Sequence, residues 1–588
     1  MANKALILHT IADVRHCVDN SLYKGRLLFC THSSVEVYLK DALSVECRCL
    51  SSFFSNEEVL CLMDSASDAV DKILDSLDEH VSPSLNERYG LKMNFFRCLY
   101  SYNGKHQYLG YLVLSGAIRK ISEIFDLTEI SLFDYKFDKL IDTDKSLRDT
   151  ISLLFKNVDV ITYQKKIESK GGKVLFNIVK RIRQRPLHSV EKLVGQLILE
   201  LKHRVFSKGK KTILIYGHLY ELDFLINRLD KYNVISYNYN SCIPAGFKSK
   251  EYVSDVSVDY RNFEDDINDS IAAVFLSDLK SDFDTNINKY LNAVLLLRDI
   301  QGKYPISLGI WGNSPVYGIK ACIVGYLLSE GITTLGAQHG CLVGDSYKPW
   351  HFDIELDRCT TFISYGFTEE DLKRLYPDKV QCPEIVPLGK VKLPNFKKAN
   401  KTIDILFPLQ SSTSMFEGGM DATLPHKLTE RQIAILNYLN GLKGLKIYVK
   451  PFMNSNYDNC SVLPVLKKMN NLTVVYDMVL LEFLERYHSA AIVMELPSQP
   501  LFEVLHMDSE IFLMNCELHP YEDQALSELL KRVHYAYDTG ELIAMLELYI
   551  SGRLQKKRDQ TFFHHYVYKE HTKRNIYKLI DRLSEGQR

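Results

Sequence analysis

Residues 307–337 read SLGIWGNSPVYGIKACIVGYLLSEGITTLGA, and this segment decides the fold class. It opens with a short apolar run at 307–311 and continues as an apolar stretch of helical length over 316–330. It closes with a second run at 332–337 that contains β-branched residues. A strand, a helix and a strand in this order form a βαβ unit, and such units build parallel sheets covered by helices. We therefore expect an α/β protein.

The same alternation recurs on both sides of this segment. The other strands that the pattern predicts lie at 4–10, 26–31, 212–217, 361–365, 403–407, 445–449, 472–476, 490–494 and 510–514. The other predicted helices lie at 56–77, 219–229, 369–375, 430–442, 480–487 and 501–505, followed by a helical tail from residue 527.

A boundary is expected at residues 387–402, where Pro and Gly are followed by a run rich in Lys and Asn. It divides the chain into an N-terminal Rossmann-like domain, 1–395, and a C-terminal Rossmann-like domain, 396–588. The first carries extra helical segments, including a basic insertion at about 165–210. Two doubly wound units of this kind face each other across a central cleft, where ligands bind outside the carboxyl ends of the strands.

Composition describes an ordinary globular protein. The 588 residues are 46% hydrophobic and 25% charged, and the formal net charge is −1. These values exclude a disordered or collagen-like chain and argue against a dedicated nucleic-acid binder, which usually carries a basic excess.

Charge is nevertheless segregated along the chain. Residues 165–211 are strongly basic and residues 251–284 strongly acidic. The basic stretch also carries an apolar stripe, so it suits contact with an anionic membrane surface. The alternative is a solvated basic face on helices that pack against the core.

Thirteen scattered cysteines without a CxxC pair are typical of buried thiols in a reducing compartment. The start of the chain has no secretory h-region, and no apolar window is long enough to cross a membrane. We expect a cytoplasmic protein, peripheral at the inner face of the cytoplasmic membrane if the basic stretch binds lipid. Since no zinc-type spacing occurs and Asp282-Phe-Asp284 lies within the acidic block, we expect no metal site.

The most informative motif is Gly336-Ala-Gln-His-Gly-Cys-Leu-Val-Gly344, at the predicted end of a strand. Glycines there let the backbone approach a ligand closely. His339 suits a general base or a phosphate partner, because its reference pKa lies near neutrality. A histidine that merely caps the turn is the alternative.

Gln338-His-Gly340, Ser364-Tyr-Gly366 and Val386-Pro-Leu-Gly389 together resemble bacterial surface-polysaccharide glycosyltransferases of the GT-B type. The resemblance covers about residues 305–570 and is closest to transferases that use CMP-activated ulosonic acids, such as capsule Kdo-transferases and polysialyltransferases. It implies a metal-independent transfer with no cofactor, a donor held by the C-terminal domain and an acceptor held by the N-terminal domain.

The resemblance also implies the donor-binding residues. Lys450-Pro451 stands where those enzymes have a His-Pro pair that holds the donor phosphate, and Glu503 where they hold a ribose hydroxyl. Ser498 precedes a predicted helix, whose free N–H groups attract a phosphate. The remaining donor-binding candidates are Gln338, Gly340, Ser411 and Ser412.

Catalysis needs a base or a stabilising carboxylate near His339. Asp345 and Asp353 follow the first motif, and Asp223 follows the strand at 212–217. Asn313 and Ser314 end another strand and are candidates for acceptor contact. Solvated acids and polar turns are the alternatives for all of them.

The sequence thus predicts a glycosyltransferase of bacterial capsule or lipopolysaccharide synthesis. Its partners would be a nucleotide-activated sugar donor, with CMP favoured, and a glycan or lipid-linked glycan acceptor. Three alternatives stay open: a polyol-phosphate transferase, a sugar-nucleotide 2-epimerase, and a non-catalytic scaffold of a polysaccharide-assembly complex.

Overall fold

The structure is a computed structural model, and every structural statement below concerns the residues that it describes. These are 3–133, 158–161, 209–216, 219–228, 231–237, 251–260, 269–340, 342–347, 350, 352–379, 382–396, 399–411, 423–452, 455 and 459–586. Ser412 and residues 165–208 of the basic segment lie outside this set. The interpretation of the basic segment as a membrane contact therefore stays a prediction.

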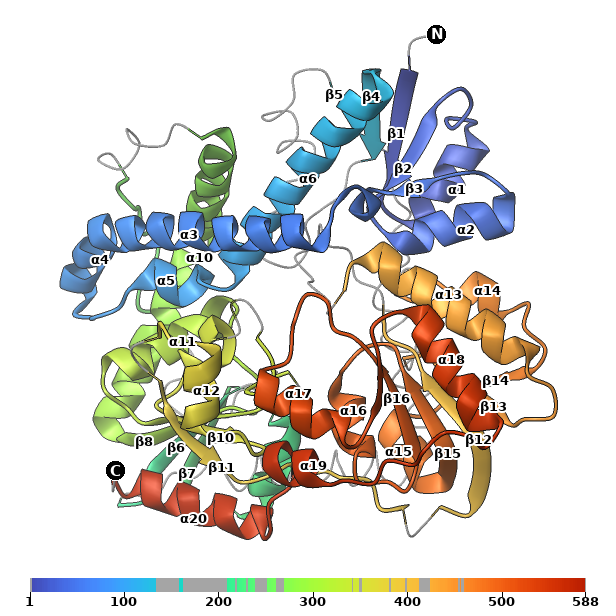
Figure 1. The fold of residues 1–588 in the computed structure, drawn as a ribbon. Coiled ribbons are helices and arrows are strands. Elements are labelled where there is room, and N and C mark those ends of the chain that lie inside the picture. The colour runs from blue at the N-terminus through green and yellow to red at the C-terminus, as the bar shows by residue number, and fades with distance from the viewer. Residues whose placement is uncertain are drawn as a thin grey trace.

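Three parallel sheets organise the molecule (Figure 1), and each is accompanied by helices. The predicted α/β fold class with two doubly wound units is confirmed by the two six-stranded sheets, which we call the central and the C-terminal sheet. A five-stranded sheet near the N-terminus was not expected as a separate unit.

The N-terminal sheet has the strand order β3-β2-β1-β4-β5, and all of its pairs are parallel. About 120 residues separate β1 from its neighbour β4, which is why the sequence pattern did not reveal the pairing. Its elements are β1 (Asn3–Leu8), α1 (Ile11–Asp19), β2 (Leu27–Cys30), α2 (Ser33–Leu43), β3 (Arg48–Cys49), η1 (Leu50–Phe53), β4 (Leu127–Phe133) and β5 (Val158–Ile161).

The central sheet has the order β11-β10-β9-β8-β6-β7. The order reverses between β6 and β8, so this is the topological switch point at which ligands bind in doubly wound sheets. The helix expected over 219–229 is a 3-10 helix, η2. The elements are β6 (Thr212–Tyr216), η2 (Tyr220–Arg228), β7 (Asn233–Tyr237), β8 (Ile306–Ile310), β9 (Thr334–Ala337), η4 (Phe352–Leu356), β10 (Thr361–Ser364), α12 (Glu369–Leu375) and β11 (Glu384–Pro387).

The C-terminal sheet has the order β14-β13-β12-β15-β16-β17, and its switch point lies between β12 and β15. Its last strand, β17, interrupts the tail that the sequence predicted as helical. The strands are β12 (Lys401–Pro408), β13 (Ile447–Lys450), β14 (Leu472–Val474), β15 (Tyr487–Met494), β16 (Glu510–Met514) and β17 (His534–Ala536). The helices are α13 (Pro425–Gly441), α14 (Leu463–Leu466), α15 (Leu480–Arg486), α16 (Gln499–Val504), α17 (Asp523–Leu530), α18 (Thr539–Ile550) and α19 (Thr561–Tyr566).

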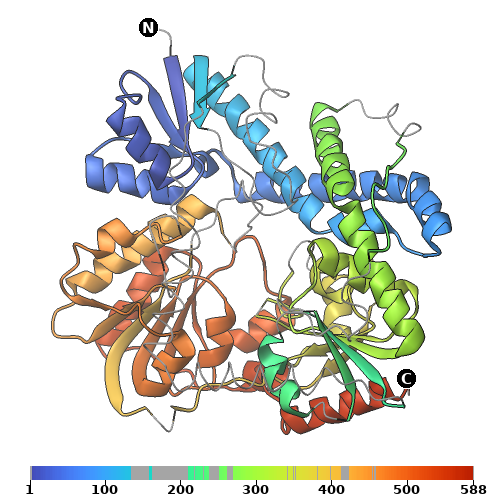
Figure 2. The same cartoon turned by 180° about the vertical axis from the view of Figure 1, so that it is seen from behind.

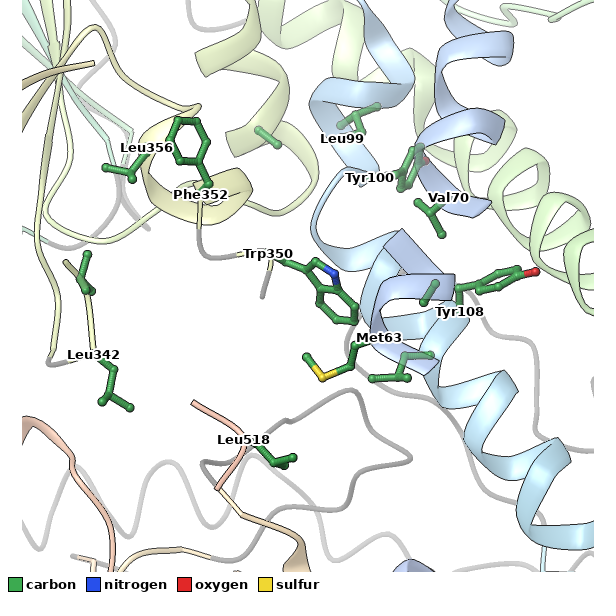
Figure 3. Close-up of a cluster of buried hydrophobic side chains, with 14 of the residues drawn as sticks. Met63, Val70, Leu99, Tyr100, Tyr108, Leu342, Trp350, Phe352, Leu356 and Leu518 are labelled. Carbon is green, nitrogen blue, oxygen red and sulfur yellow. The ribbon is translucent and has the colours of Figure 1, made fainter. Parts of the chain in front are cut away.

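A helical layer joins the N-terminal and central sheets, which agrees with the predicted extra helices. One buried apolar cluster runs through it, and Figure 3 shows Trp350 directed toward Met63 of α3, with Leu518 of the C-terminal unit nearby. His106 of α6 contacts the Trp350 ring edge-on, with 5.0 Å between ring centroids. The helices of the layer are α3 (Asn56–His80), α4 (Ser82–Tyr89), α5 (Phe95–Tyr100), α6 (Asn103–Phe125), α10 (Ser270–Lys303) and α11 (Gly318–Ser329).

The last part of the acidic block, residues 270–284, belongs to α10, where its carboxylates have partners. Asp282 is buried and accepts a hydrogen bond from the Tyr100 hydroxyl at 2.5 Å, while Asp284 accepts one from Tyr260 at 2.9 Å. This Asp-Phe-Asp segment therefore links α10 to α5 and to the segment 251–260.

The last helix, α20 (Thr572–Ser584), returns from the C-terminal unit to the central sheet (Figure 2). Its apolar face packs with Ile213 and Leu308, and Tyr232 donates a hydrogen bond to Asp581 at 2.8 Å. The chain thus connects the central and C-terminal units twice. Among the described helices, none has both the length and the apolar character needed to cross a bilayer.

Candidate functional site

The turn after β9 is built around Gln338, which is almost fully buried. Its Oε1 accepts a hydrogen bond from the Tyr365 backbone N–H at 2.7 Å, and its Nε2 donates to the Gly340 carbonyl at 3.0 Å. The turn is thereby fixed to the end of the neighbouring strand β10. Gly340 has φ +107, a conformation that favours glycine. These contacts hold the turn that carries His339 in a fixed conformation.

His339 is half-buried and packs edge-on against Tyr220, with 4.4 Å between ring centroids. Burial lowers the pKa of His339, the charge of Glu221 opposes that shift, and the charge of Lys390 adds to it. The imidazole is therefore mainly neutral at pH 7, the form that accepts a proton.

A buried ion pair lies beside this histidine. Lys390 Nζ donates to Glu221 Oε1 at 2.7 Å, and both side chains are almost fully buried. The second oxygen of Glu221 accepts the Lys392 backbone N–H at 2.9 Å, while Lys390 lies over the Tyr365 ring at 5.2 Å. Two segments about 170 residues apart are thus joined by one ion pair.

Glu503, on α16 of the C-terminal unit, lies close enough to the same ion pair for both of its charges to act on it. Burial raises its pKa to about 6, the charge of Lys390 and a hydrogen bond from Gln499 lower it, and Glu221 raises it. The neighbouring Phe502 contacts the ring of Tyr365, with 6.1 Å between centroids. We call His339, Glu221, Lys390 and Glu503 the charged cluster; both units contribute to it.

At the switch point of the C-terminal sheet, Gln410 follows β12 and reaches across to the loop after β15. Its Nε2 donates to Ser498 Oγ at 2.5 Å, and its backbone N–H donates to the buried Glu495 at 2.5 Å. Ser411 stands next to this link and is half-buried. The hydroxyls predicted to hold a donor thus gather where this sheet type binds nucleotides.

Lys450 ends the neighbouring strand β13 and is buried. Its Nζ donates to the carbonyl of Pro451 at 2.7 Å. Burial lowers its pKa, and the charge of Asp477 opposes that shift. An anion bound beside the strand end would give this ammonium group a stronger partner than a carbonyl.

Among the described contacts, none joins the other predicted residues to His339 or Glu503. Asp223 is more than half exposed and forms an ion pair with Lys392 at 2.8 Å. Asn313 is exposed, and Ser314 donates a hydrogen bond to the Ile354 carbonyl. Asp353 belongs to η4, but its side chain is outside the described set.

Asp345 lies at the joint between the central and C-terminal units. Its carbonyl accepts the Glu522 backbone N–H at 3.0 Å, and the next residue, Ser346, pairs with Tyr521. Its carboxylate is fully buried and has no side-chain hydrogen-bond partner among the described residues. Burial raises its pKa, the backbone N–H groups of Asp345 and Val343 lower it, and its charge acts on the pKa of the Tyr566 hydroxyl. Nearby, a Cβ at Gly366 would meet the His565 carbonyl oxygen at 1.9 Å, so this close approach of the two units requires glycine.

We expect Asp345→Asn to stabilise the fold at pH 8 by about 1–3 kcal/mol, with little effect at pH 4. Burial raises the pKa of Asp345 to about 7 from 3.8. Between these values the folded chain binds a proton that the unfolded chain has lost, so stability falls as the pH rises. Urea midpoints from pH 4 to pH 8.5 would measure the difference, and equal pH slopes in both proteins would contradict the prediction.

Sequence reasoning missed Glu221 and Lys390. Glu221 stands two residues before the Asp223 that was chosen, and Lys390 directly follows the Pro-Leu-Gly389 motif. Their positions after β6 and β11, at the same edge of the sheet, were the available signal.

No family model matches this chain, and no curated protein sequence matches it. Among solved structures, it is similar to UDP-GlcNAc 2-epimerase from Neisseria meningitidis bound to UDP-GlcNAc, with 11% identity, 63% of this chain and 100% of that chain covered, and a TM-score of 0.36. It is also similar to the Methanocaldococcus jannaschii enzyme of that name (10%, 63% and 99%, 0.36) and to MurG from Acinetobacter baumannii (11%, 63% and 99%, 0.33). The fold class rests on the strand orders above, and no activity follows from these matches.

Proposed function

We propose that this protein is a glycosyltransferase of the GT-B type. The C-terminal unit would hold a nucleotide-activated sugar, and the central unit would hold a glycan acceptor. The observation that carries the proposal is the charged cluster: Glu503 from the C-terminal unit and His339 from the central unit share the charged neighbours Glu221 and Lys390. A donor bound at the C-terminal switch point would place its sugar close to a neutral base.

The proposed reaction uses this arrangement directly. The acceptor hydroxyl oxygen forms a bond to the anomeric carbon, and its proton passes to His339. The bond between that carbon and the leaving phosphate oxygen breaks. Lys450 and the hydroxyl of Ser498 would stabilise the phosphate charge, with Ser411 beside them. Glu503 would hold a ribose hydroxyl of the donor. The charges all come from side chains, so the proposal includes neither metal nor cofactor.

The identities of the donor and the acceptor are proposed from the resemblance of the sequence motifs. We propose a CMP-activated ulosonic acid as donor and a bacterial capsule or lipopolysaccharide glycan as acceptor. The acceptor would lie toward Asn313 and Asp223. The basic segment 165–211 would hold the enzyme at an anionic membrane surface.

A nucleotide thermal-shift panel tests donor binding. We expect CMP, added to the full chain beside CDP, UDP and GDP, to raise the unfolding midpoint most. A ligand at a hundred times its Kd stabilises the folded state by about 2.7 kcal/mol. Lys450→Met should abolish most of the shift, because it removes the proposed phosphate contact.

Lys446→Met is the matched control, since Lys446 is exposed just before the same strand. The panel separates the possibilities: a preference for UDP would replace the CMP assignment, and no shift with any nucleotide would refute donor binding by this unit.

A further inference from the structure

A cluster of thiols outside the charged cluster lies at the carboxyl edge of the N-terminal sheet. Cys30 is the last residue of β2 and Cys49 the last of β3, and the two are register partners in this parallel pair. Both are fully buried. Residues paired in register on adjacent strands carry their side chains on the same face of the sheet, so these two thiols are directed to one place.

Two further side chains join them. The Cys30 thiol is also in hydrogen-bond contact with the Cys47 thiol. Glu36, on α2, accepts the Cys49 backbone N–H at 3.3 Å, which holds its carboxylate against the strand end. The ligand atoms of Cys30, Glu36 and Cys49 all lie within 4.8 Å of one another, and no other group of this kind occurs among the residues that the structure describes.

We propose that Cys30, Cys49, Glu36 and Cys47 form a structural zinc site. In a tetrahedral site with Zn–S bonds of about 2.3 Å, two sulfur ligands stand about 3.8 Å apart. The ligand atoms of Cys30, Glu36 and Cys49, which lie within 4.8 Å of one another, therefore need only a small contraction, whereas Cys47, placed by its contact with Cys30, would have to move further to complete the set. Thiolate ligands with a single carboxylate favour Zn²⁺ over hard ions such as Mg²⁺ or Ca²⁺.

The surroundings suit a closed site. Four protein ligands leave no open coordination position, which is typical of a structural ion. Ser51 Oγ lies 3.2 Å from Cys49 Sγ and also 3.0 Å from Nδ1 of His426 on α13. The ion would thus fix the ends of β2 and β3 and, through Ser51, the contact of the N-terminal sheet with the C-terminal unit.

The sequence analysis expected no metal because these ligands have no zinc-type spacing. Strand pairing, rather than a short motif, brings them together. Cys47 and Cys49 form a CxC, whereas Cys30 and Glu36 come from the preceding strand and helix.

Cobalt titration of the reduced, metal-free full chain tests the site. We expect one Co²⁺ per chain, with sulfur-to-cobalt charge-transfer and tetrahedral d–d absorption that one equivalent of Zn²⁺ displaces. Cys49→Ser should weaken binding about 100-fold or more, since loss of even an outer-shell partner costs 10–100-fold. Cys17→Ser should leave binding unchanged, because Cys17 is a buried thiol of the same unit outside the cluster.

Two outcomes would overturn the proposal. One is the absence of cobalt–thiolate absorption in the reduced parent. That result would refute the site even if the oxidised parent formed a Cys30–Cys49 disulfide. The other is unchanged binding in the Cys30→Ser/Cys49→Ser double variant. If that variant does not fold, X-ray absorption of the zinc-loaded parent decides: two or three sulfur neighbours support the site, and none refutes it.

Discussion

Lys390→Met is expected to lower the free energy of unfolding by about 3–5 kcal/mol, the usual cost of breaking a buried ion pair from one side. The substitution preserves the length of the side chain but leaves the Glu221 carboxylate buried without its 2.7 Å partner. It also removes the positive charge that acts on Glu503 and His339. Urea denaturation followed by tryptophan fluorescence and circular dichroism would measure the loss.

Lys392→Met provides a close control. Lys392 lies two residues further along and pairs with Asp223, but both side chains are about half exposed, so this pair is worth about 0–1 kcal/mol. Adding Glu221→Leu to Lys390→Met should restore most of the stability, because no unpaired buried charge remains. Equal losses in the two lysine variants would show that burial of the Lys390 pair has no special role.

His339→Ala is expected to reduce sugar transfer by about 100- to 10,000-fold, the usual contribution of a general base. The nucleotide-induced thermal shift should persist, because the donor contacts lie on the C-terminal unit. Since burial keeps the pKa of His339 below its ordinary value, the parent should be active at pH 7 and lose activity as the pH falls through that pKa. The variant should lack this acidic limb. Rates measured with the nucleotide sugar that the panel selects would check both points.

His564→Ala is the matched control, because His564 is exposed on α19. It should keep the parental rate and pH profile. If His339→Ala retained the rate within about threefold, the histidine would be a turn-capping residue and the base would have to be sought elsewhere. If the parent itself showed no transfer despite binding a nucleotide, the scaffold or the epimerase alternative would gain support.

Much of the central and C-terminal sheets could be predicted, because their strands are short apolar runs separated by helices of clear periodicity. The strand at Glu510–Met514 and the helix at Glu369–Leu375 have the predicted bounds. Of the N-terminal sheet only the strands at 4–10 and 26–31 were predicted, because β1 pairs with β4 across six intervening α-helices, α1 to α6. β17 has only three residues and owes its strand conformation to pairing with β16.

The residues of the candidate site also fall into those that the sequence predicted and those that it did not. His339 could be selected because its motif stands at a predicted strand end, and Glu503 because the resembling family holds a ribose hydroxyl at that position. The structure brings both to the charged cluster. Glu221 and Lys390 were missed in spite of their positions at the same sheet edge, since a glutamate and a lysine after a strand are ordinarily solvated and only tertiary packing buries them together. Asp345 was predicted from its position after the first motif. In the structure its carbonyl and the neighbouring Ser346 contact the segment 520–522, so it lies at the joint between two units.

The return of α20 to the central sheet has a consequence for synthesis. Ile576, Leu579, Ile580 and Leu583 complete the apolar layer against the strands of that sheet. These residues are translated well after β11, the last strand of that sheet, so one face of the central sheet stays uncovered until α20 has been made. The central sheet can therefore complete its folding only after the strands of the C-terminal sheet, which end at residue 536, have all been made. A stop codon before residue 572 would damage a unit whose strands were made hundreds of residues earlier.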